Sequence, residues 1–250
     1  MIRVRDELDG QVCRIVLHRP KANVLDAAMI AAISGVLDTL RPDVRLLVFE
    51  GAGDHFCFGA SVEEHRADRA AEMLAAFHAL FRQLATLAVP TMALVRGQCL
   101  GGGLELASWC TWIVSTPNAR FGQPEVSLAV FPPMASVLLP WRLGGAAALD
   151  LCVSGRSWTA LEAHQRGLVT AIVEEPEAWM SDFVIRELAA KSAAALRFAE
   201  RAARVGLMER LGRELPILEA MYLHELMATH DANEGIAAFL ERRQPLYTHS

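Results

Sequence analysis

Hydrophobic residues follow two alternating patterns along most of the chain. Short apolar runs that end at glycine, proline or charged residues are typical of buried strands, whereas apolar residues repeated every three or four positions are typical of amphipathic helices. The short runs predict strands at residues 11–17, 45–50, 91–96, 112–115 and 168–174. The helical spacing predicts helices at residues 29–40, 73–87, 104–110, 131–141 and 146–154.

Polar residues and prolines mark where several helices begin. Asp26 precedes the first helix and can cap it, because its carboxylate can accept from a free N–H group. Thr159 and Glu162 have the spacing of a capping box for a further short helix. Pro132 and Pro133 fit a first helical turn, where the missing N–H groups have no intrahelical acceptor to lose.

The last part of the chain is helical throughout. From residue 177 onward the apolar spacing is that of helices, and Asp231 and Glu234 mark the start of the final one. Strands and helices that recur and then give way to a helical tail indicate α/β layering with a terminal helical region. We divide the chain into a core, residues 1–191, and a helical region, residues 192–250. Because the helical region has little sheet to pack on, we expect it to contact other subunits in an oligomer.

Composition limits the classes of function. The chain has 250 residues, 53% of them hydrophobic, and a formal net charge of −5. Its basic residues are dispersed, apart from 201–204 and 242–243, which we expect to be solvated, so a nucleic-acid surface is not predicted. No apolar run reaches the roughly 18 residues of a membrane helix, and the N-terminus lacks the apolar segment of a signal peptide. The five cysteines form no CxxC pair and are expected to be reduced, which predicts a cytoplasmic protein.

Residues 91–110, TMALVRGQCLGGGLELASWC, carry the strongest chemical signal. A predicted strand passes through three glycines into a helix whose first N–H groups have no internal partner. A dinucleotide fingerprint would need glycine at Leu106, and a phosphate-binding loop would need a lysine that is absent. In the remaining pattern, GxxxGGGxE, Glu105 lies one turn beyond Gly102 and can act beside whatever the Gly102 N–H binds. The alternative is a packing turn with a solvated glutamate.

A second glycine loop and a second carboxylate complete the requirements of a hydrolase or hydratase. Such an enzyme needs a place for developing negative charge and groups that move protons. Gly59 and Ala60 lie in a loop after a predicted strand and can supply another N–H. Glu125 follows Pro124 in residues 119–128, which we expect to be extended and stiff. Alone, these features would read as a turn and an exposed glutamate.

Five motifs along the chain resemble the crotonase (enoyl-CoA hydratase/isomerase) superfamily in the same order: HRPKANVLD, FCFGASVEE, RGQCLGGGLELA, FGQPEVSL and THDANEGIAAFLERRQP. The resemblance covers essentially the whole chain. It implies a crotonase-like spiral of ββα units with a C-terminal helical trimerisation region, assembled as a homotrimer or as a hexamer of two trimers. It also implies an acyl-CoA substrate, with coenzyme A as part of that substrate and no separate cofactor or metal.

The resemblance also assigns roles to residues. It makes the N–H groups of Ala60 and Gly102 an oxyanion hole for the thioester carbonyl, and it makes Glu105 and Glu125 the catalytic pair that activates water and protonates carbon. It implies that coenzyme A binds at these positions: Lys21, Ala22, Val24, Ala60, Ser61 and Val62.

Two departures from the family pattern indicate an altered acyl pocket. Ser61 stands where many hydratases have aspartate, and Pro132-Pro133 stand in a segment that is often glycine-rich. The combination FGASVEEH, RGQCLGGGLELA and MATHDANEG is most similar to the branch of the family that hydrates cyclohexa-1,5-diene-1-carbonyl-CoA in anaerobic aromatic degradation. In that reaction the hydroxyl goes to the β-carbon and the proton to the far end of the conjugated diene.

Other functions remain as alternatives. A general enoyl-CoA hydratase or isomerase of fatty-acid metabolism would share the same motifs, and a non-catalytic scaffold could bind acyl-CoA or RNA but would not need both glutamates. A serine hydrolase would need Ser61 in a GxSxG frame, and a zinc hydrolase would need histidine at Ala228. We expect His65 and His78 to be surface or boundary residues rather than catalysts.

Overall fold

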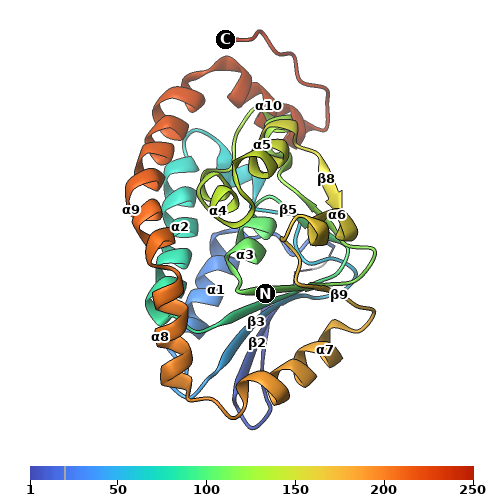
Figure 1. Cartoon of the computed structure of the whole chain (residues 1–250). Coiled ribbons are helices and arrows are strands. Elements are labelled where there is room, and N and C mark those ends of the chain that lie inside the picture. The colour runs from blue at the N-terminus through green and yellow to red at the C-terminus, as the bar shows by residue number, and fades with distance from the viewer. Residues whose placement is uncertain (20) are drawn as a thin grey trace.

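The computed structural model describes residues 1–19 and 21–250, which form two sheets and a set of surrounding helices (Figure 1). The larger sheet has the order β1-β2-β3-β4-β6-β9, and the smaller has the order β5-β7-β8. Strand β1 is antiparallel to β2, and the other neighbours in the larger sheet are parallel. The strands are β1 (Ile2–Glu7), β2 (Val12–Leu17), β3 (Leu46–Gly51), β4 (Thr91–Val95), β5 (Gln98–Leu100), β6 (Trp112–Ser115), β7 (Arg120–Gly122), β8 (Ser157–Thr159) and β9 (Ala171–Ile172).

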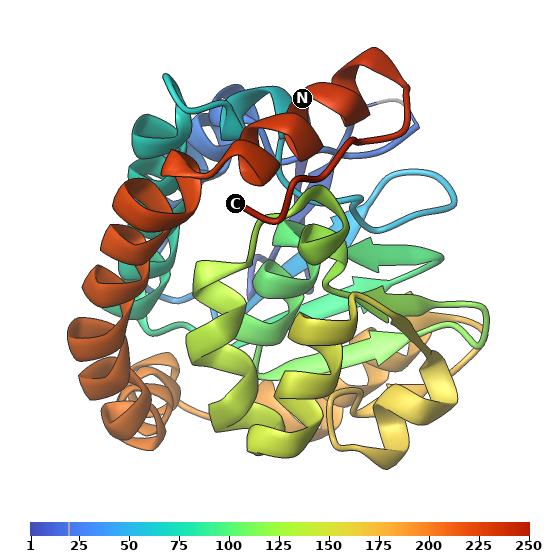
Figure 2. The same cartoon turned by 90° about the horizontal axis from the view of Figure 1, so that it is seen from above.

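Helices cover the sheets and extend into the C-terminal region. The α-helices are α1 (Ala27–Asp38), α2 (Ala70–Leu87), α3 (Gly102–Trp109), α4 (Pro133–Leu143), α5 (Gly145–Ser154), α6 (Ala160–Gln165), α7 (Pro176–Phe183), α8 (Ala193–Ala203), α9 (Val205–Ala220) and α10 (His230–Glu241). Short 3₁₀ turns are η1 (Val62–His65), η2 (Pro124–Leu128) and η5 (Leu226–Ala228), and π-helical turns are η3 (Val184–Leu188) and η4 (Met221–Glu225). Figure 2 shows α9 running beside α2 along one side of the molecule.

The strongest sequence signals are confirmed. The predicted strands at residues 11–17, 45–50, 91–96 and 112–115 correspond to β2, β3, β4 and β6, and the five predicted helices correspond to α1 to α5. Asp26 caps α1 by accepting a 2.8 Å hydrogen bond from the amide of Met29. Thr159 and Glu162 form the expected capping box at α6. Local capping chemistry therefore predicted these helix starts correctly.

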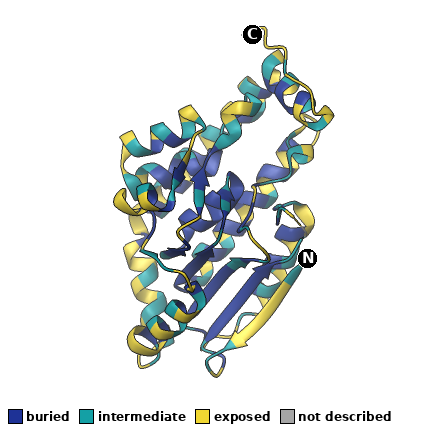
Figure 3. Ribbon diagram, turned by 90° about the vertical axis from the view of Figure 1, so that its right-hand side faces the viewer, coloured by how far each residue is buried: buried dark blue, intermediate teal, exposed yellow. Residues whose placement is uncertain are grey.

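Two predicted extended segments are wrong over most of their length. Residues 168–174 contain only the two-residue strand β9, and residues 119–128 are not extended throughout, because η2 follows β7 and holds Glu125 in a 3₁₀ turn. Strands β1, β5 and β8 were not predicted. Strand β1 lies at the sheet edge with most side chains exposed (Figure 3), so it can carry charged residues and shows no apolar run.

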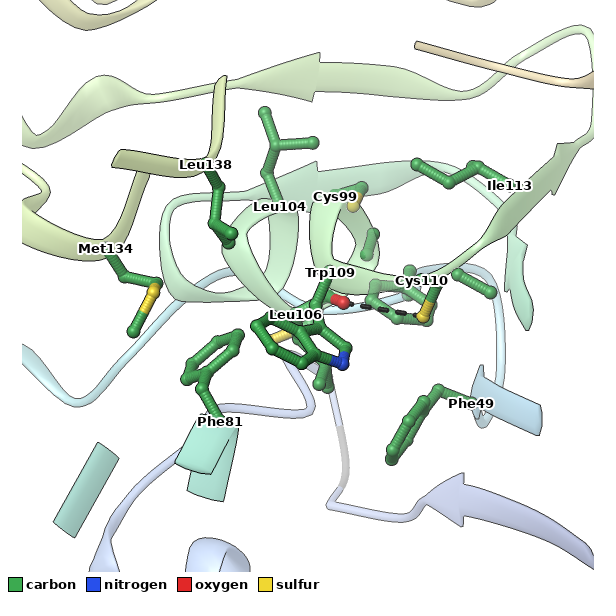
Figure 4. Close-up of a cluster of buried hydrophobic side chains, with 14 of the residues drawn as sticks. Phe49, Phe81, Cys99, Leu104, Leu106, Trp109, Cys110, Ile113, Met134 and Leu138 are labelled. Carbon is green, nitrogen blue, oxygen red and sulfur yellow. Dashed lines mark hydrogen bonds between the residues drawn. The ribbon is translucent and has the colours of Figure 1, made fainter. Parts of the chain in front are cut away.

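Helix α3 lies at the centre of the main core. All of its residues are buried, and Figure 4 shows Trp109 close to the ring of Phe81 while Leu138 and Met134 lie beside the same helix. The Trp109 and Phe81 ring centroids are 5.6 Å apart in an edge-on arrangement. This packing fixes the position and rotation of the helix that carries Glu105.

Part of the apolar face of the C-terminal region is buried within its own chain. Leu207, Leu211 and Leu215 of α9 belong to the main core and pack toward α4. Arg204 is also buried and donates to the backbone oxygen of Trp109 at 2.7 Å, so the expectation of a solvated 201–204 segment is wrong at this position. Assembly through the helical region stays a prediction.

Candidate active site

The site begins where β5 meets the buried helix α3. Gly101 connects them with φ +50°, a backbone conformation that favours glycine. Its amide donates to the oxygen of Gly122 at 2.9 Å, and its own oxygen accepts from the amide of Glu105 at 2.9 Å. A Cβ atom on Gly101 would lie 2.6 Å from Oε1 of Glu125. Glycine here thus lets α3 start directly beside the second carboxylate.

A second backbone segment closes against this helix start. A Cβ atom on Gly102 would lie 3.0 Å from the amide nitrogen of Ala60, and one on Gly59 would lie 3.6 Å from the amide nitrogen of Gly102. Gly59 has φ +116°, which again favours glycine. Because neither glycine has a side chain, the main chain at residue 60 can lie against the main chain at residue 102, which is 42 positions later in the sequence.

The two amides at this contact are available to a ligand. Gly102 is the first residue of α3, so its N–H has no acceptor within the helix. Ala60 pairs with Leu25 in an isolated parallel bridge that uses the oxygen of Gly59 and the amide of Ser61, and the N–H of Ala60 takes no part in it. Two neighbouring free N–H groups are the usual components of an oxyanion hole.

A cavity of about 80 Å³ lies beside these amides. It brings together Ala60, Gly102, Glu105 and Glu125, the four residues predicted for the oxyanion hole and the proton transfers. The other lining residues are mostly apolar and come from the segment 58–65, the start of α3, α2, η2 and the segment 130–133: Phe58, Gly59, Val62, His65, Met73, Leu74, Phe77, His78, Gly101, Pro124, Leu128, Val130, Phe131, Pro132 and Pro133. The Pro132-Pro133 departure from the family pattern thus forms part of the cavity wall.

Glu105 is held on the first turn of α3 and is 5% exposed. Its Oε1 accepts a 2.6 Å hydrogen bond from the amide of Ala135, in the first turn of α4. Burial raises the pKa of Glu105 to about 7, although the amides of Ala135 and Met134 favour the charged form. A carboxyl group with this pKa can accept or release a proton near neutral pH.

Glu125 shares the cavity from η2. Burial raises the pKa of Glu125 to about 8, and the negative charge of Glu105 adds to the increase. The buried amide of Gln123 faces this carboxyl group and, with its nitrogen turned toward it, donates at 3.0 Å and 3.1 Å to the two oxygens. Near neutral pH the two glutamates therefore tend to hold one proton between them, which is the state that suits one acid and one base.

The segment predicted to bind coenzyme A runs beside the Ala60 loop. The amide of Phe58 donates to the oxygen of Ala22 at 3.0 Å, and the Leu25–Ala60 bridge follows. Of the predicted contacts, two line the cavity and four lie outside it; the two are Ala60 and Val62, and the four are Lys21, Ala22, Val24 and Ser61. Lys21 is exposed, so its ammonium group is available to a ligand that approaches from solvent.

Asn23 holds this loop and was not predicted. It has φ +48°, which asparagine adopts more easily than most residues. Its Oδ1 accepts from the amide of Arg19, and its Nδ2 donates to the oxygens of Ala52 and His55, each at 3.0 Å. Asn23 thereby ties the loop to the turn after β3. Pro20, in the same motif, lies outside the described residues.

Two histidines also line the cavity, and the expectation that His78 lies at the surface or boundary is wrong. His78 is fully buried on α2, and Nδ1 of the half-buried His65 donates to the backbone oxygen of Ser61 at 2.7 Å. The spacing of Leu74, Phe77 and Phe81 places residue 78 on the apolar face of α2, so this signal was present in the sequence.

The described residues contain neither a metal-binding cluster nor a membrane-spanning helix. Across residues 1–19 and 21–250, no three His, Cys, Asp or Glu side chains are grouped so that they could hold a metal ion. Within the same residues, no helix has the length and apolar character needed to cross a membrane.

Comparison with known proteins gives a consistent family match. The family model for enoyl-CoA hydratase/isomerase matches residues 7–250. The chain is 48% identical over 244 residues to the cyclohexa-1,5-dienecarbonyl-CoA hydratase of Thauera aromatica, covering 97% of this chain and 95% of that protein. It is 32% identical over 248 residues to the crotonyl-CoA hydratase of Syntrophomonas wolfei subsp. wolfei, covering 95% of each.

Solved structures show the same fold. An enoyl-CoA hydratase from Mycobacterium avium subsp. paratuberculosis K-10 superposes with a TM-score of 0.85 at 26% identity, covering 99% of this chain and 98% of that one. An enoyl-CoA hydratase from Bacillus anthracis gives a TM-score of 0.77 at 27% identity, covering 100% and 99%. The expected α/β fold with its C-terminal helical region is therefore confirmed.

Proposed function

The chain belongs to the enoyl-CoA hydratase/isomerase family, as an enoyl-CoA hydratase and thus a carbon–oxygen lyase, and we propose that it hydrates a cyclic dienoyl-CoA, cyclohexa-1,5-diene-1-carbonyl-CoA. One observation carries the choice of substrate. Identity is 48% to the relative named for the cyclic dienoyl thioester but 32% to the relative named for crotonyl-CoA, at nearly equal coverage. This reaction would belong to the anaerobic degradation of aromatic compounds.

The oxyanion hole in this proposal is formed by the N–H groups of Ala60 and Gly102. Addition of water to the β-carbon drives negative charge onto the thioester oxygen, and two fixed amides stabilise that charge without reorganising at the moment of reaction. The two amides lie close together at the N-terminus of α3, which supports the assignment. Loss of one such donor typically costs about 3 kcal/mol of transition-state stabilisation.

The two glutamates would divide the proton transfers. Glu105 accepts the hydrogen bond from the amide of Ala135, which favours its charged form, and as a carboxylate it would take a proton from water while the water oxygen bonds to the β-carbon. Glu125, with a pKa of about 8, would give its proton to the far carbon of the resulting dienolate. One water molecule is added in total, and the proton on Glu105 then returns to Glu125 or to solvent.

The cavity wall supports a compact acyl group. Phe131, Pro132 and Pro133 line the cavity beside α4, and Phe77 lines it from α2. Proline and aromatic side chains have few rotatable bonds, so this wall would favour a rigid ring over a flexible chain. The predicted coenzyme A contacts would hold the rest of the substrate across the segments 21–24 and 60–62.

Turnover in heavy-oxygen water tests the proposal. We expect kcat/KM for cyclohexa-1,5-diene-1-carbonyl-CoA to exceed that for crotonyl-CoA by roughly 10- to 200-fold, the range for shape selection in apolar pockets. A preference for crotonyl-CoA would instead identify a general hydratase. Exchange of carbon-bound hydrogen without incorporation of heavy oxygen would identify an isomerase. Binding of both thioesters without turnover would identify a non-catalytic scaffold.

Assembly, domains and location complete the proposal. We expect a homotrimer or a hexamer of two trimers, in which residues 192–250 mediate contacts and residues 1–191 bind the acyl-CoA. Because coenzyme A is part of the substrate, no additional cofactor or metal is required. We also propose a cytoplasmic location, which the five free cysteines support.

A further inference from the structure

His78 and Glu219 form a buried pair next to the proposed catalytic cavity. Nδ1 of His78 lies 2.5 Å from Oε1 of Glu219, although the two residues are 141 positions apart. The His78 side chain is 0% exposed, and Glu219 is 26% exposed on α9. Arg82 approaches the same Glu219 oxygen at 3.6 Å. The C-terminal region therefore contributes a charged partner to a side chain of the cavity wall.

This pairing fixes the chemical form of His78. A carboxylate has only acceptor atoms, so a neutral imidazole beside it carries its hydrogen on Nδ1 and presents a lone pair on Nε2. Burial lowers the pKa of His78, while contact with Glu219 opposes that effect. Among the described residues, Nε2 is buried and has no hydrogen-bond partner. An unpaired acceptor in such a setting is costly unless a ligand or water satisfies it.

His78 lines the proposed catalytic cavity and also a second cavity between α2, α4 and α9, and we infer that Nε2 serves a ligand in the first. His78 lines the same cavity as Glu105 and Glu125, and its neighbour Phe77 reaches within 3.3 Å of where a Cβ on Gly102 would lie. An enoyl group consists of carbon and hydrogen beyond its thioester, so it has no strong donor for Nε2. The hydroxyacyl product has one, the newly formed hydroxyl.

We propose that His78 is a specificity-determining residue whose Nε2 accepts a hydrogen bond from the hydroxyl of the hydroxyacyl thioester, and that Glu219 is a positioning residue that holds His78 in the required tautomer. The inference depends on the hydratase activity and not on the cyclic form of the acyl group. It assigns to α9 a role in recognising the product, in addition to its packing role.

Kinetics in the dehydration direction test the role of His78. His78→Asn keeps an N–H that can reach Glu219 but removes the acceptor at Nε2. We expect its KM for the hydroxyacyl-CoA to rise about 3- to 10-fold, as for loss of one neutral hydrogen bond, while the inhibition constant of the corresponding acyl-CoA without the hydroxyl stays within about twofold. His164→Asn is the matched control, because His164 is exposed on α6, bonds the oxygen of Val169 and is not part of the cavity. It should change neither constant.

Two product pairs separate this inference from the proposed substrate. In each pair the hydroxyacyl-CoA is the substrate and the compound without the hydroxyl is the inhibitor. The cyclic pair is 6-hydroxycyclohex-1-ene-1-carbonyl-CoA and cyclohex-1-ene-1-carbonyl-CoA, and the linear pair is 3-hydroxybutyryl-CoA and butyryl-CoA. The two constants are compared for the pair whose hydroxyacyl-CoA the enzyme dehydrates. Dehydration of only the linear product would overturn the cyclic substrate and still test His78. Equal weakening of both members of a pair, or of neither, would overturn the role of His78.

The tautomer of His78 provides a second test, which does not require His78→Asn to fold. Nitrogen-15 NMR of the wild-type protein should show hydrogen on Nδ1. Glu219→Leu should move it to Nε2, and Glu219→Gln should restore the Nδ1 form because the amide oxygen also accepts. An Nε2-protonated ring in the wild-type protein would overturn the proposal, as would an unchanged tautomer in Glu219→Leu.

Discussion

The carboxyl group of Glu105 and the backbone amide of Ala135 are joined by a 2.6 Å hydrogen bond that links the first turn of α3 to the first turn of α4. Both partners are buried, so the bond fixes the carboxyl group against the cavity wall. The proposed base is therefore oriented by a main-chain group, and its direction does not depend on another side chain that could rotate.

Replacing either glutamate should stop hydration without preventing binding. Glu105→Gln and Glu125→Gln keep the side-chain shape but remove proton transfer, so each should lower kcat by about 10²- to 10⁴-fold with little change in acyl-CoA affinity. The double variant should lose far less than the product of the single effects, because the pair acts as a unit. Initial rates and binding isotherms check this, and an almost fully active single variant contradicts the two-glutamate assignment.

Two variants distinguish the role of the Gly102 N–H from the role of the missing side chain at this position. Gly102→Pro removes the N–H at the first position of α3, where proline is tolerated in helices. It should reduce kcat about 100-fold or more, as for loss of an oxyanion donor. Gly102→Ala is the control, since it adds a Cβ in the same crowded place but retains the N–H. Equal losses in the two variants, both shown to be folded, would mean that crowding and not the amide matters.

Substitution of Gly101 should disturb the site more than substitution of a helix glycine on the surface. Gly101→Ala places a Cβ 2.6 Å from Oε1 of Glu125 in a backbone with φ +50°, so we expect a loss of about 1–3 kcal/mol of stability and displacement of Glu125. Gly206→Ala is the control, because a Cβ there would meet no described atom within 4 Å. Chemical denaturation of both proteins provides the comparison. Similar midpoints would show that Gly101 is not conformationally required.

The raised pKa of Glu125 predicts how stability depends on pH. The pKa of Glu125 is about 8 in the folded chain, above its unfolded value. While the buried carboxyl group is protonated in both the folded and the unfolded chain, it does not lower the free energy of unfolding. As pH rises above the unfolded value, near 4.5, ionisation favours the unfolded chain, and the loss of stability grows until about pH 8. Glu125→Gln should therefore be more stable than wild type by roughly 2–4 kcal/mol at pH 8 and by little below pH 4.5. Urea denaturation across this range measures the difference, and a constant difference would contradict the raised pKa.

Exposed aromatic residues on the C-terminal helices provide a test of assembly. Phe198 on α8 is 63% exposed and Phe239 on α10 is 55% exposed. If residues 192–250 mediate assembly, Phe198→Glu or Phe239→Glu should shift the protein toward smaller species in light scattering, because a buried charge destabilises an interface. Leu161→Glu on α6, at a residue that is 58% exposed, is the control outside this region. A wild-type protein that is a stable monomer at micromolar concentration would contradict the prediction.

The sequence predicted those parts of the fold whose signals are local. The apolar run at Thr91–Val95, the glycines before α3 and the cap at Asp26 each depend on a few neighbouring residues, and the structure has them as expected. By contrast, β5 and β8 have three residues each and exist because both pair with β7. Strands of three residues are too short to show a periodic pattern. Their hydrogen bonds also link segments that are distant in the sequence.

The candidate site was predictable in its residue types but not in all of its contacts. Glu105 and Glu125 could be selected from the glycine and proline patterns around them, yet Pro124 is compatible with both an extended segment and the first turn of η2, and the first was wrongly favoured. The hydrogen bond from Ala135 to Glu105 depends on how α4 packs against α3. His78 was misjudged because its residue type suggested a surface position, whereas its place on the apolar face of α2 indicated burial.

The long separation between His78 and Glu219 has a consequence for protein synthesis. A ribosome releases the N-terminal part of a chain first, so α2, α3 and η2 leave it well before α9. A nascent chain that ends at residue 191 already contains Ala60, Gly102, Glu105 and Glu125 but has no partner for Nδ1 of His78. The proposed catalytic groups and His78 itself are therefore synthesised first, and under our proposal the tautomer of His78 is fixed only after Glu219 has been added.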